Sequence, residues 1–171
     1  MLIGLSGYAQ TGKDEVAKIL VERHGFSRLA FADGIKRFLE LQLGGLADFA
    51  DVDWDEMKKD PEWRELLQRT GVAMREVFGE DVLVDRMHLG HAAAISRCVI
   101  TDVRFENEAA AIREYGGRIW RVSRPDVGAL NGHVSEVGID AILADQGIDN
   151  DGSLDDLAEC VEAALSRLMG G

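Results

Sequence analysis

The stretch that decides the fold is Met1 to Leu20, MLIGLSGYAQTGKDEVAKIL. It opens with an apolar run at Leu2, Ile3 and Leu5, passes through the loop Gly7–Lys13 (GYAQTGK), and continues at once as a helical pattern. The expected order is strand, glycine-bounded loop and helix. This is the context in which a G-x-x-x-x-G-K segment surrounds phosphate groups.

The loop has the chemistry that a phosphate site needs. Gly7 and Gly12 can adopt backbone angles closed to other residues, so the loop can turn its N–H groups inward around an anion. The helix that begins near Gly12 adds the positive end of its dipole, and Lys13 adds a mobile charge that can reach β- and γ-phosphates. An ordinary glycine-rich turn is the alternative, but it does not explain a lysine at a helix start, where the dipole disfavours a cation.

The loop therefore predicts a nucleoside triphosphate site. The residues that we expect to bind the triphosphate of ATP are Gly7, Tyr8, Ala9, Gln10, Thr11, Gly12, Lys13 and Asp14. Asp14 stands where the general motif has a Ser or Thr on Mg²⁺. An aspartate at this position can hold the metal directly or through water, although it adds negative charge beside the phosphates.

Composition limits the other classes of function. The chain has 171 residues, 46% of them hydrophobic, which suits one α/β domain with a substantial core. The net charge of −12 argues against a broad nucleic-acid surface, because duplex binding needs a positive face. No apolar run approaches the ~18 residues of a membrane span. Because the first residues are expected to form a core strand, we expect no signal peptide and a cytoplasmic protein. The sequence does not determine the oligomeric state, and a homodimer is compatible with it.

Periodicity predicts alternating strands and helices. Strands are expected at Leu2–Leu5, Phe26–Phe31, Cys98–Asp102, Arg118–Ser123 and Gly147–Asn150. Helices are expected at Lys13–His24, Asp33–Leu43, Pro61–Phe78, Asp81–Ala94, Glu106–Tyr115 and Ser135–Leu143, and after the N-cap Ser153. This alternation predicts an α/β fold with a parallel sheet and helices on both faces. Its ligand should lie at the carboxyl ends of the strands, where Gly7–Lys13, Asp33, Asp102 and Arg124 fall.

A second group of candidate residues follows the third strand. Asp102 is placed like the acidic residue that orients magnesium-bound water in P-loop enzymes, although many strands end in Asp. Arg104 can grip a phosphate with its planar guanidinium, and a surface ion pair with Glu106 or Glu108 is its alternative.

Three arginines, at 118, 121 and 124, are spaced by three around the fourth strand. In a strand Arg118 and Arg124 share one face and Arg121 takes the other. Pro125 indicates that the strand ends before Arg124, which is then available to enter the site from a loop that acts as a lid.

Taken together with these motifs, the sequence resembles the deoxynucleoside monophosphate kinases of bacteriophages. The matching blocks are SGYAQTGKD, FADGIK, WRELLQRTG, TDVRFENEAAAIREYGG, RVSRP with HVSE, and IDNDGSLDDL, in this order across nearly the whole chain. The family has an aspartate after the lysine, as Asp14 is here. The resemblance implies a three-layer P-loop kinase fold over residues 1–171, with an acceptor-binding helical insert at about 33–94 and a lid at about 124–143.

The resemblance also implies roles for single residues. It places Asn150 near the adenine of ATP, and Asp14 and Asp102 on Mg²⁺. It assigns Lys13, Arg104 and Arg124 to catalysis. It assigns the acceptor monophosphate to Asp33, Lys36, Arg64, Gln68, Arg104, Glu108, His133 and Glu136. Arg75 is added to this set because its helix is expected to face the acceptor. The position of Arg75 on its helix fits an exposed ion pair equally well.

The sequence thus predicts ATP-dependent phosphorylation of a (deoxy)nucleoside 5′-monophosphate to the diphosphate, in the host cytoplasm if a phage encodes it. One alternative is a P-loop kinase of another small metabolite, such as dephospho-coenzyme A. A second is a nucleotide-binding switch that hydrolyses ATP slowly, against which the chain's own arginines argue. The base and sugar of the acceptor are not fixed by the sequence.

Overall fold

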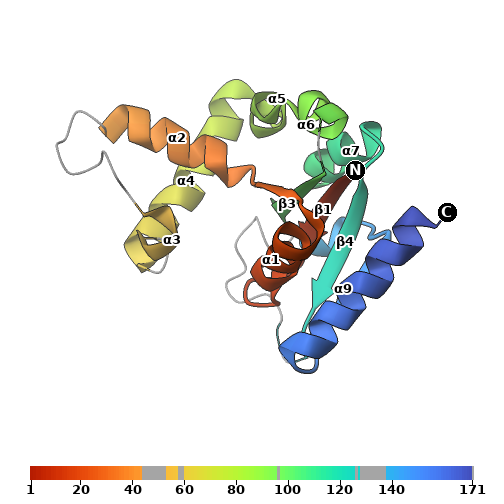
Figure 1. Cartoon of the computed structure of the whole chain (residues 1–171). Helices are drawn as coiled ribbons and strands as arrows, with labels where there is room; N and C mark the ends of the chain where they lie inside the picture. Colours follow the sequence, from red (N-terminus) through yellow and green to blue (C-terminus); the bar gives the residue numbers. More distant parts are fainter. Residues whose placement is uncertain (44–52, 58–59, 96, 126, 128–137, 171) are drawn as a thin grey trace. The chain divides into compact units, whose positions relative to one another are not determined.

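The computed structural model describes the chain apart from residues 44–52, 58–59, 96, 126, 128–137 and 171 (Figure 1). The described residues form two compact units. Unit 1 combines Met1–Leu29 with Leu89–Gly171, and unit 2 is Ala30–His88. Among the described residues no helix is both long enough and apolar enough to cross a membrane.

Unit 1 is built on a parallel sheet of five strands. They are β1 (Leu2–Ser6), β2 (Ser27–Leu29), β3 (Cys98–Val103), β4 (Arg118–Ser123) and β5 (Gln146–Asp149), in the spatial order β2-β3-β1-β4-β5. Every neighbouring pair is parallel. Because β1 lies in the middle of the sheet, the loop that follows it emerges between β3 and β4, at the point where the chain order reverses on the two sides.

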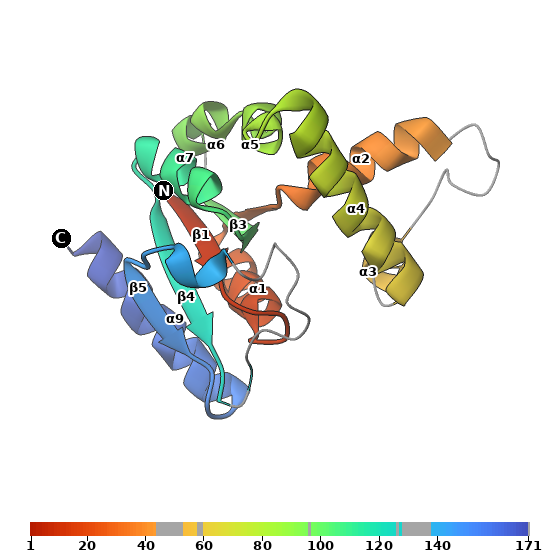
Figure 2. The same ribbon diagram turned by 180° about the vertical axis from the view of Figure 1, so that it is seen from behind.

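Helices cover both faces of this sheet, which confirms the predicted three-layer architecture. α1 (Lys13–His24) and α9 (Leu154–Met169) lie together on one face, and α7 (Glu106–Glu114) packs on the other (Figures 1 and 2). The remaining elements of unit 1 are α6 (Leu89–Ile95) and a 3-10 turn, η1 (Ile139–Ala141).

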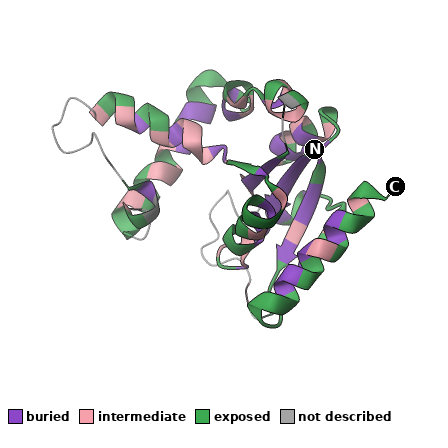
Figure 3. Ribbon diagram, viewed as in Figure 1, coloured by how far each residue is buried: buried purple, intermediate pink, exposed green. Residues whose placement is uncertain are grey.

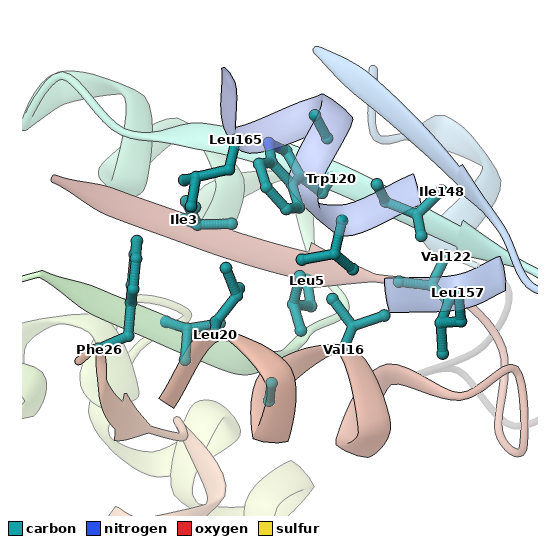
Figure 4. Close-up of a cluster of buried hydrophobic side chains, with 14 residues drawn as sticks. Ile3, Leu5, Val16, Leu20, Phe26, Trp120, Val122, Ile148, Leu157 and Leu165 are labelled. Atoms are coloured by element: carbon teal, nitrogen blue, oxygen red, sulfur yellow. The ribbon is translucent and has the colours of Figure 1, made fainter. Parts of the chain in front are cut away.

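Side chains of β1 alternate between the two faces of the sheet, so this strand takes part in packing on both. Ile3 and Leu5 join Val16 and Leu20 of α1 and Leu157 of α9 in one buried cluster (Figure 4). The opposite face is reached by Gly4, where an added Cβ would lie 2.7 Å from Cδ1 of Ile112 in α7. A glycine is needed there because α7 packs so close to the strand.

The secondary structure described in unit 2 is helical. Its helices are α2 (Ala32–Leu43), α3 (Trp54–Met57), α4 (Pro61–Phe78) and α5 (Val82–Met87). Ile35 and Leu39 of α2 are buried, and a Cβ on Gly71 of α4 would lie 2.8 Å from Cδ1 of Ile35. Buried and exposed residues follow one another along α2 and α4 (Figure 3), as expected for helices that pack one side into a small core.

Several sequence predictions need correction. The strand predicted at Phe26–Phe31 is shorter and spans Ser27–Leu29, because the N–H of Ala30 donates to Asp33 (3.0 Å) in the turn that precedes α2. The helix predicted at Asp81–Ala94 is two helices, separated at His88, whose φ is +51°. Phe38 of α2 and Leu154 of α9 are apolar residues on predicted helices, yet they are 36% and 65% exposed.

Two predicted segments fall partly outside the described residues. Of the helix predicted at Ser135–Leu143, the structure describes residues 138–143, and only Ile139–Ala141 form a helical turn. Much of the segment predicted as a lid, about 124–143, also lies outside the described residues. The helical insert was predicted at about 33–94, whereas Leu89–Ile95 group with the sheet in unit 1.

Candidate active site

The loop between β1 and α1 has the backbone that a phosphate site requires. Gly7 has a φ of +144° and Gly12 a φ of +101°, and the non-glycine Gln10 adopts +66°. A Cβ on Gly7 would lie 2.3 Å from the carbonyl oxygen of Val122 in β4, so this glycine is fixed by space as well as by angle. The loop is therefore held in one conformation by its neighbours.

Lys13, the first residue of α1, folds back over this loop. Its Nζ donates hydrogen bonds to the carbonyl oxygens of Gly7 (2.8 Å) and Tyr8 (2.6 Å). Thr11 is buried and its hydroxyl donates to the same Tyr8 carbonyl (3.0 Å). The lysine amine thus lies beside the backbone that is expected to surround phosphate, in the place where a cation is otherwise unfavourable at a helix start.

Two distant side chains contact the same loop. The hydroxyl of Tyr8 donates to Oδ2 of Asp140 in η1 at 2.5 Å. The side-chain nitrogen of Asn150, just after β5, donates to the carbonyl of Thr11 at 3.0 Å. Sequence analysis did not find Asp140. It assigned Asn150 to adenine by resemblance and gave no sign of a contact with the loop.

Asp102 and Arg104 lie half-buried at the end of β3 and in the turn after it. Glu108 of α7 is 1% exposed, and its Oε2 accepts hydrogen bonds from the backbone N–H groups of Arg104 (2.8 Å) and Phe105 (3.1 Å). Glu106 pairs instead with Arg113, at 3.5 Å. The described contacts of Glu108 are therefore those of a helix cap that holds the Arg104 turn, and its predicted role toward the acceptor stays a prediction.

Arg124 follows β4 directly and is exposed. It lines a cavity of about 290 Å³ together with Ser123, Pro125, Asp149 and Asp151. The Ser123 hydroxyl donates to Oδ1 of Asp149 at 2.6 Å, which ties the ends of β4 and β5 together. Asp149 was missed, although its position at the carboxyl end of a strand was the signal that singled out Asp102.

The neighbouring Arg121 has a different environment. Its Nη2 donates to the carbonyl oxygens of Ile139 (2.6 Å) and Ile142 (2.7 Å), and its Nη1 lies 3.7 Å from Asp140. Arg121 therefore anchors η1 to β4, and Arg118 lies 3.8 Å from Asp145. Of the three arginines, only Arg124 lines the cavity.

The acceptor residues predicted in unit 2 make local contacts. The amine of Lys36, whose side chain is 15% exposed, lies 3.4 Å from Asp33. Arg75 is buried, and its Nη1 donates to the carbonyl of Glu80 at 2.9 Å, so the exposed ion pair considered for it is wrong. Arg64 is exposed and Gln68 half-buried on α4, whereas His133 and Glu136 lie outside the described residues.

Comparison with known proteins decides the family. A family model, deoxynucleotide monophosphate kinase, matches residues 72–161. A protein of Acanthamoeba polyphaga mimivirus, named "Putative deoxynucleotide monophosphate kinase", is 30% identical over 165 residues, covering 83% of this chain and 83% of the relative. The chain belongs to the deoxynucleotide monophosphate kinase family. The predicted resemblance, and with it a nucleoside-monophosphate kinase, is confirmed.

Solved structures confirm the fold of this kinase. Dephospho-CoA kinase from Campylobacter jejuni superposes with a TM-score of 0.54 at 15% identity, covering 99% of this chain and 98% of the other. Shikimate kinase from Aquifex aeolicus gives a TM-score of 0.53 at 13% identity, with both chains covered completely. At such low identity these matches establish a shared kinase fold and say nothing of the acceptor.

The carboxylates among the described residues are also compatible with binding of a magnesium–nucleotide complex. Among the described residues there is no cluster of three or more histidines, cysteines and carboxylates that would enclose a metal. Mg²⁺ in phosphoryl-transfer enzymes does not need such a cluster, because it is bound by one or two carboxylates together with substrate phosphates and water. Asp14 at the start of α1 and Asp102 at the end of β3 supply carboxylates of that kind.

Proposed function

We propose that this kinase transfers the γ-phosphoryl group of ATP to the 5′-phosphate of a (deoxy)nucleoside monophosphate, giving ADP and a diphosphate. One observation carries the proposal. The amine of Lys13 lies over a loop whose Gly7 and Gly12 both have positive φ, at the N-terminus of α1. Backbone N–H groups, a helix dipole and a lysine cation meeting at one loop form a site for a polyphosphate.

The donor is assigned to unit 1. Residues Gly7 to Lys13 hold its phosphates, and Asp14 and Asp102 would hold Mg²⁺, which would supply positive charge to offset that of the phosphates. The cavity between the ends of β4 and β5 takes the nucleoside of ATP, since Ser123, Asp149 and Asp151 are among the residues that line it. A ribose and an adenine offer hydroxyl and amino donors to such carboxylates.

The acceptor is assigned to basic and polar side chains. Arg104 grips its phosphate from the turn after β3, and the planar guanidinium suits two oxygens of one phosphate. We assign the remainder of the acceptor to Asp33, Lys36, Arg64, Gln68, Arg75, Glu108, His133 and Glu136. Positive side chains are required despite the net charge of −12, because two polyanions must be brought together.

The chemistry needs little covalent participation from the protein. An oxygen of the acceptor phosphate attacks the γ-phosphorus, the bond from that phosphorus to the β-bridging oxygen breaks, and ADP leaves. Lys13 and the loop N–H groups balance charge on the donor side. Arg124, on the exposed segment after β4, balances the charge that spreads over the moving phosphoryl group.

The test is product analysis. Wild-type protein is incubated with Mg-ATP and each common ribo- and deoxyribonucleoside monophosphate, with dephospho-coenzyme A as a further acceptor, and the products are separated by chromatography. We expect one ADP for each diphosphate formed, and no product from dephospho-coenzyme A. ATP hydrolysis at the same rate with and without an acceptor contradicts the proposal and favours a nucleotide switch.

A binding experiment separates the same two alternatives without turnover. A bisubstrate analogue, two nucleosides joined by a polyphosphate, should bind this kinase much more tightly than ATP, because the two linked halves pay the association entropy once. A switch with a single nucleotide site should bind the two ligands equally.

A further inference from the structure

Asn150 is attached to the rest of unit 1 at two points. Its backbone N–H donates to the carbonyl of Ser123 at 2.8 Å, which fixes the residue beside the end of β4. Its side-chain nitrogen donates to the carbonyl of Thr11 at 3.0 Å, across 139 positions of sequence. The side chain of Asn150 therefore joins the phosphate loop to the segment that follows β5.

Gly12 makes room for this contact. A Cβ at position 12 would lie 2.3 Å from Nδ2 of Asn150, closer than any real contact of that kind. The φ of Gly12 already favours glycine, so backbone angle and neighbouring side chain impose the same residue. The close approach shows that the loop and Asn150 fit together as one unit.

The hydrogen bond to Thr11 also controls the next N–H group. In a trans peptide the carbonyl oxygen and the following N–H point in opposite directions. When Asn150 holds the carbonyl of Thr11, it consequently sets the direction of the N–H of Gly12. A phosphate loop works by turning such N–H groups toward the anion, and a peptide that rotates freely would instead present its carbonyl oxygen to the phosphates.

We propose that Asn150 is a positioning residue of the phosphate loop, acting on the triphosphate through the Thr11–Gly12 peptide. This rests on the proposed function, because it assumes that the loop binds the phosphates of ATP. It differs from the adenine contact that the family resemblance implies for Asn150. A residue that contacts adenine affects the affinity only of ligands that have a base. A residue that orients the loop affects the affinity of every polyphosphate.

The experiment compares two ligands on the purified full chain by isothermal titration. One is ATP, and the other is inorganic tripolyphosphate, which has no base or ribose. Asn150→Ala should weaken both by a similar factor of about three to ten, the loss of one hydrogen bond. Asn150→Asp, which keeps the shape but cannot donate to Thr11 and adds a charge, should weaken both by more than about tenfold.

Controls make the outcomes distinct. Asp155→Asn changes an exposed residue in the first turn of α9 and should leave both affinities unchanged. Melting temperatures of all variants verify that they are folded. If Asn150→Ala does not fold, the affinities of Asn150→Asp alone provide the test. A loss confined to ATP, or unchanged affinities for both ligands in both variants, overturns the positioning role. A wild-type protein that binds neither ligand overturns the proposed function itself.

Discussion

The two units hold their predicted functional residues in different ways. In unit 1 the phosphate loop is fixed by contacts between remote parts of the chain. Tyr8 contacts Asp140 across 132 positions, and Thr11 contacts Asn150 across 139. In unit 2 the hydrogen bonds described for Lys36, Arg75 and Trp54 are local: their partners Asp33, Glu80 and Glu40 lie 3, 5 and 14 positions away.

This difference suggests a division of work. A site fixed by sheet topology keeps its geometry whichever acceptor is present, which suits the invariant donor. Helices held by local contacts can change their surface residues at little cost to the sheet, which suits a variable acceptor. Substitutions at the donor residues of unit 1 should then alter turnover with every acceptor, and those at the acceptor residues of unit 2 should alter acceptor affinity or the stability of its helices.

The largest effect is expected at Arg124. Arg124→Ala should lower kcat by about 10³-fold and leave ATP affinity within about threefold, because an arginine of this kind acts mainly on transition-state charge. Arg124→Lys should recover little, since lysine lacks the planar guanidinium. Steady-state kinetics and ATP titration provide the measurement. Arg121→Ala is the matched control and should lower the melting temperature while the folded enzyme keeps its kcat. The reverse order would move the catalytic role to Arg121.

Lys13 should give the next largest effect. Lys13→Ala should lower kcat/KM by at least ~10²-fold with every acceptor, since we propose that its amine binds the donor phosphates whatever the acceptor is. The measurement is kcat/KM for ATP with two different acceptors, alongside circular dichroism to verify the fold. Normal turnover in a well-folded variant would remove the phosphate loop from the mechanism.

Lys36 tests the acceptor side. Lys36→Ala should raise the KM for the monophosphate by about tenfold and leave the KM for ATP unchanged, if its charge meets the acceptor phosphate. Arg37→Ala, which removes the next cation along α2, is the control and should change neither KM, because Arg37 pairs with Glu40 on an exposed surface. An increase in the KM for ATP with Lys36→Ala would break the division between donor and acceptor.

A smaller effect, on stability, is expected at Trp54. Its Nε1 donates to Glu40 at 2.8 Å, and this hydrogen bond, followed by one from Arg37, lowers the pKa of Glu40 below its ordinary 4.5. Trp54→Phe should cost about 1 kcal/mol at pH 7. A lowered folded pKa gives stability that is complete above pH 4.5 and lost as the pH falls through that pKa. The difference between wild type and variant in urea unfolding should therefore narrow in acid, and a pH-independent difference would contradict this account.

The smallest effect is expected at Ser6, in the central strand. Ser6 is fully buried, and its hydroxyl has no hydrogen-bond partner among the described residues. Ser6→Ala should therefore raise the free energy of unfolding by up to about 1 kcal/mol, because it removes an unsatisfied polar group. Urea denaturation measures the change. Thr101→Val is the control: it removes a hydroxyl that contacts the Leu29 carbonyl and should lower stability.

Features with local causes were predictable from the sequence. The helix predicted at Lys13–His24 has those limits, because Gly25 adopts a φ of +67° and ends it. The strand Arg118–Ser123 is also as predicted, and Pro125 follows it closely. The contact of Asn150 with Thr11 could not be predicted, because it depends on the sheet order, and the helix break falls at His88 itself, two residues before Gly90.

The position of β1 has a consequence for synthesis of the chain. β1 is complete at Ser6, but its two partners, β3 and β4, end at Val103 and Ser123. At ribosomal rates of ~5–20 residues per second, the first strand waits roughly 6 to 23 seconds before its second partner has been translated. Both edges of this apolar strand are unpaired until β3 has been translated, and one edge until β4 has, a state that favours aggregation. The central position of β1 places the phosphate loop in the middle of the sheet. It therefore also makes the pairing of this strand in the nascent chain depend on synthesis of the last third of the sequence.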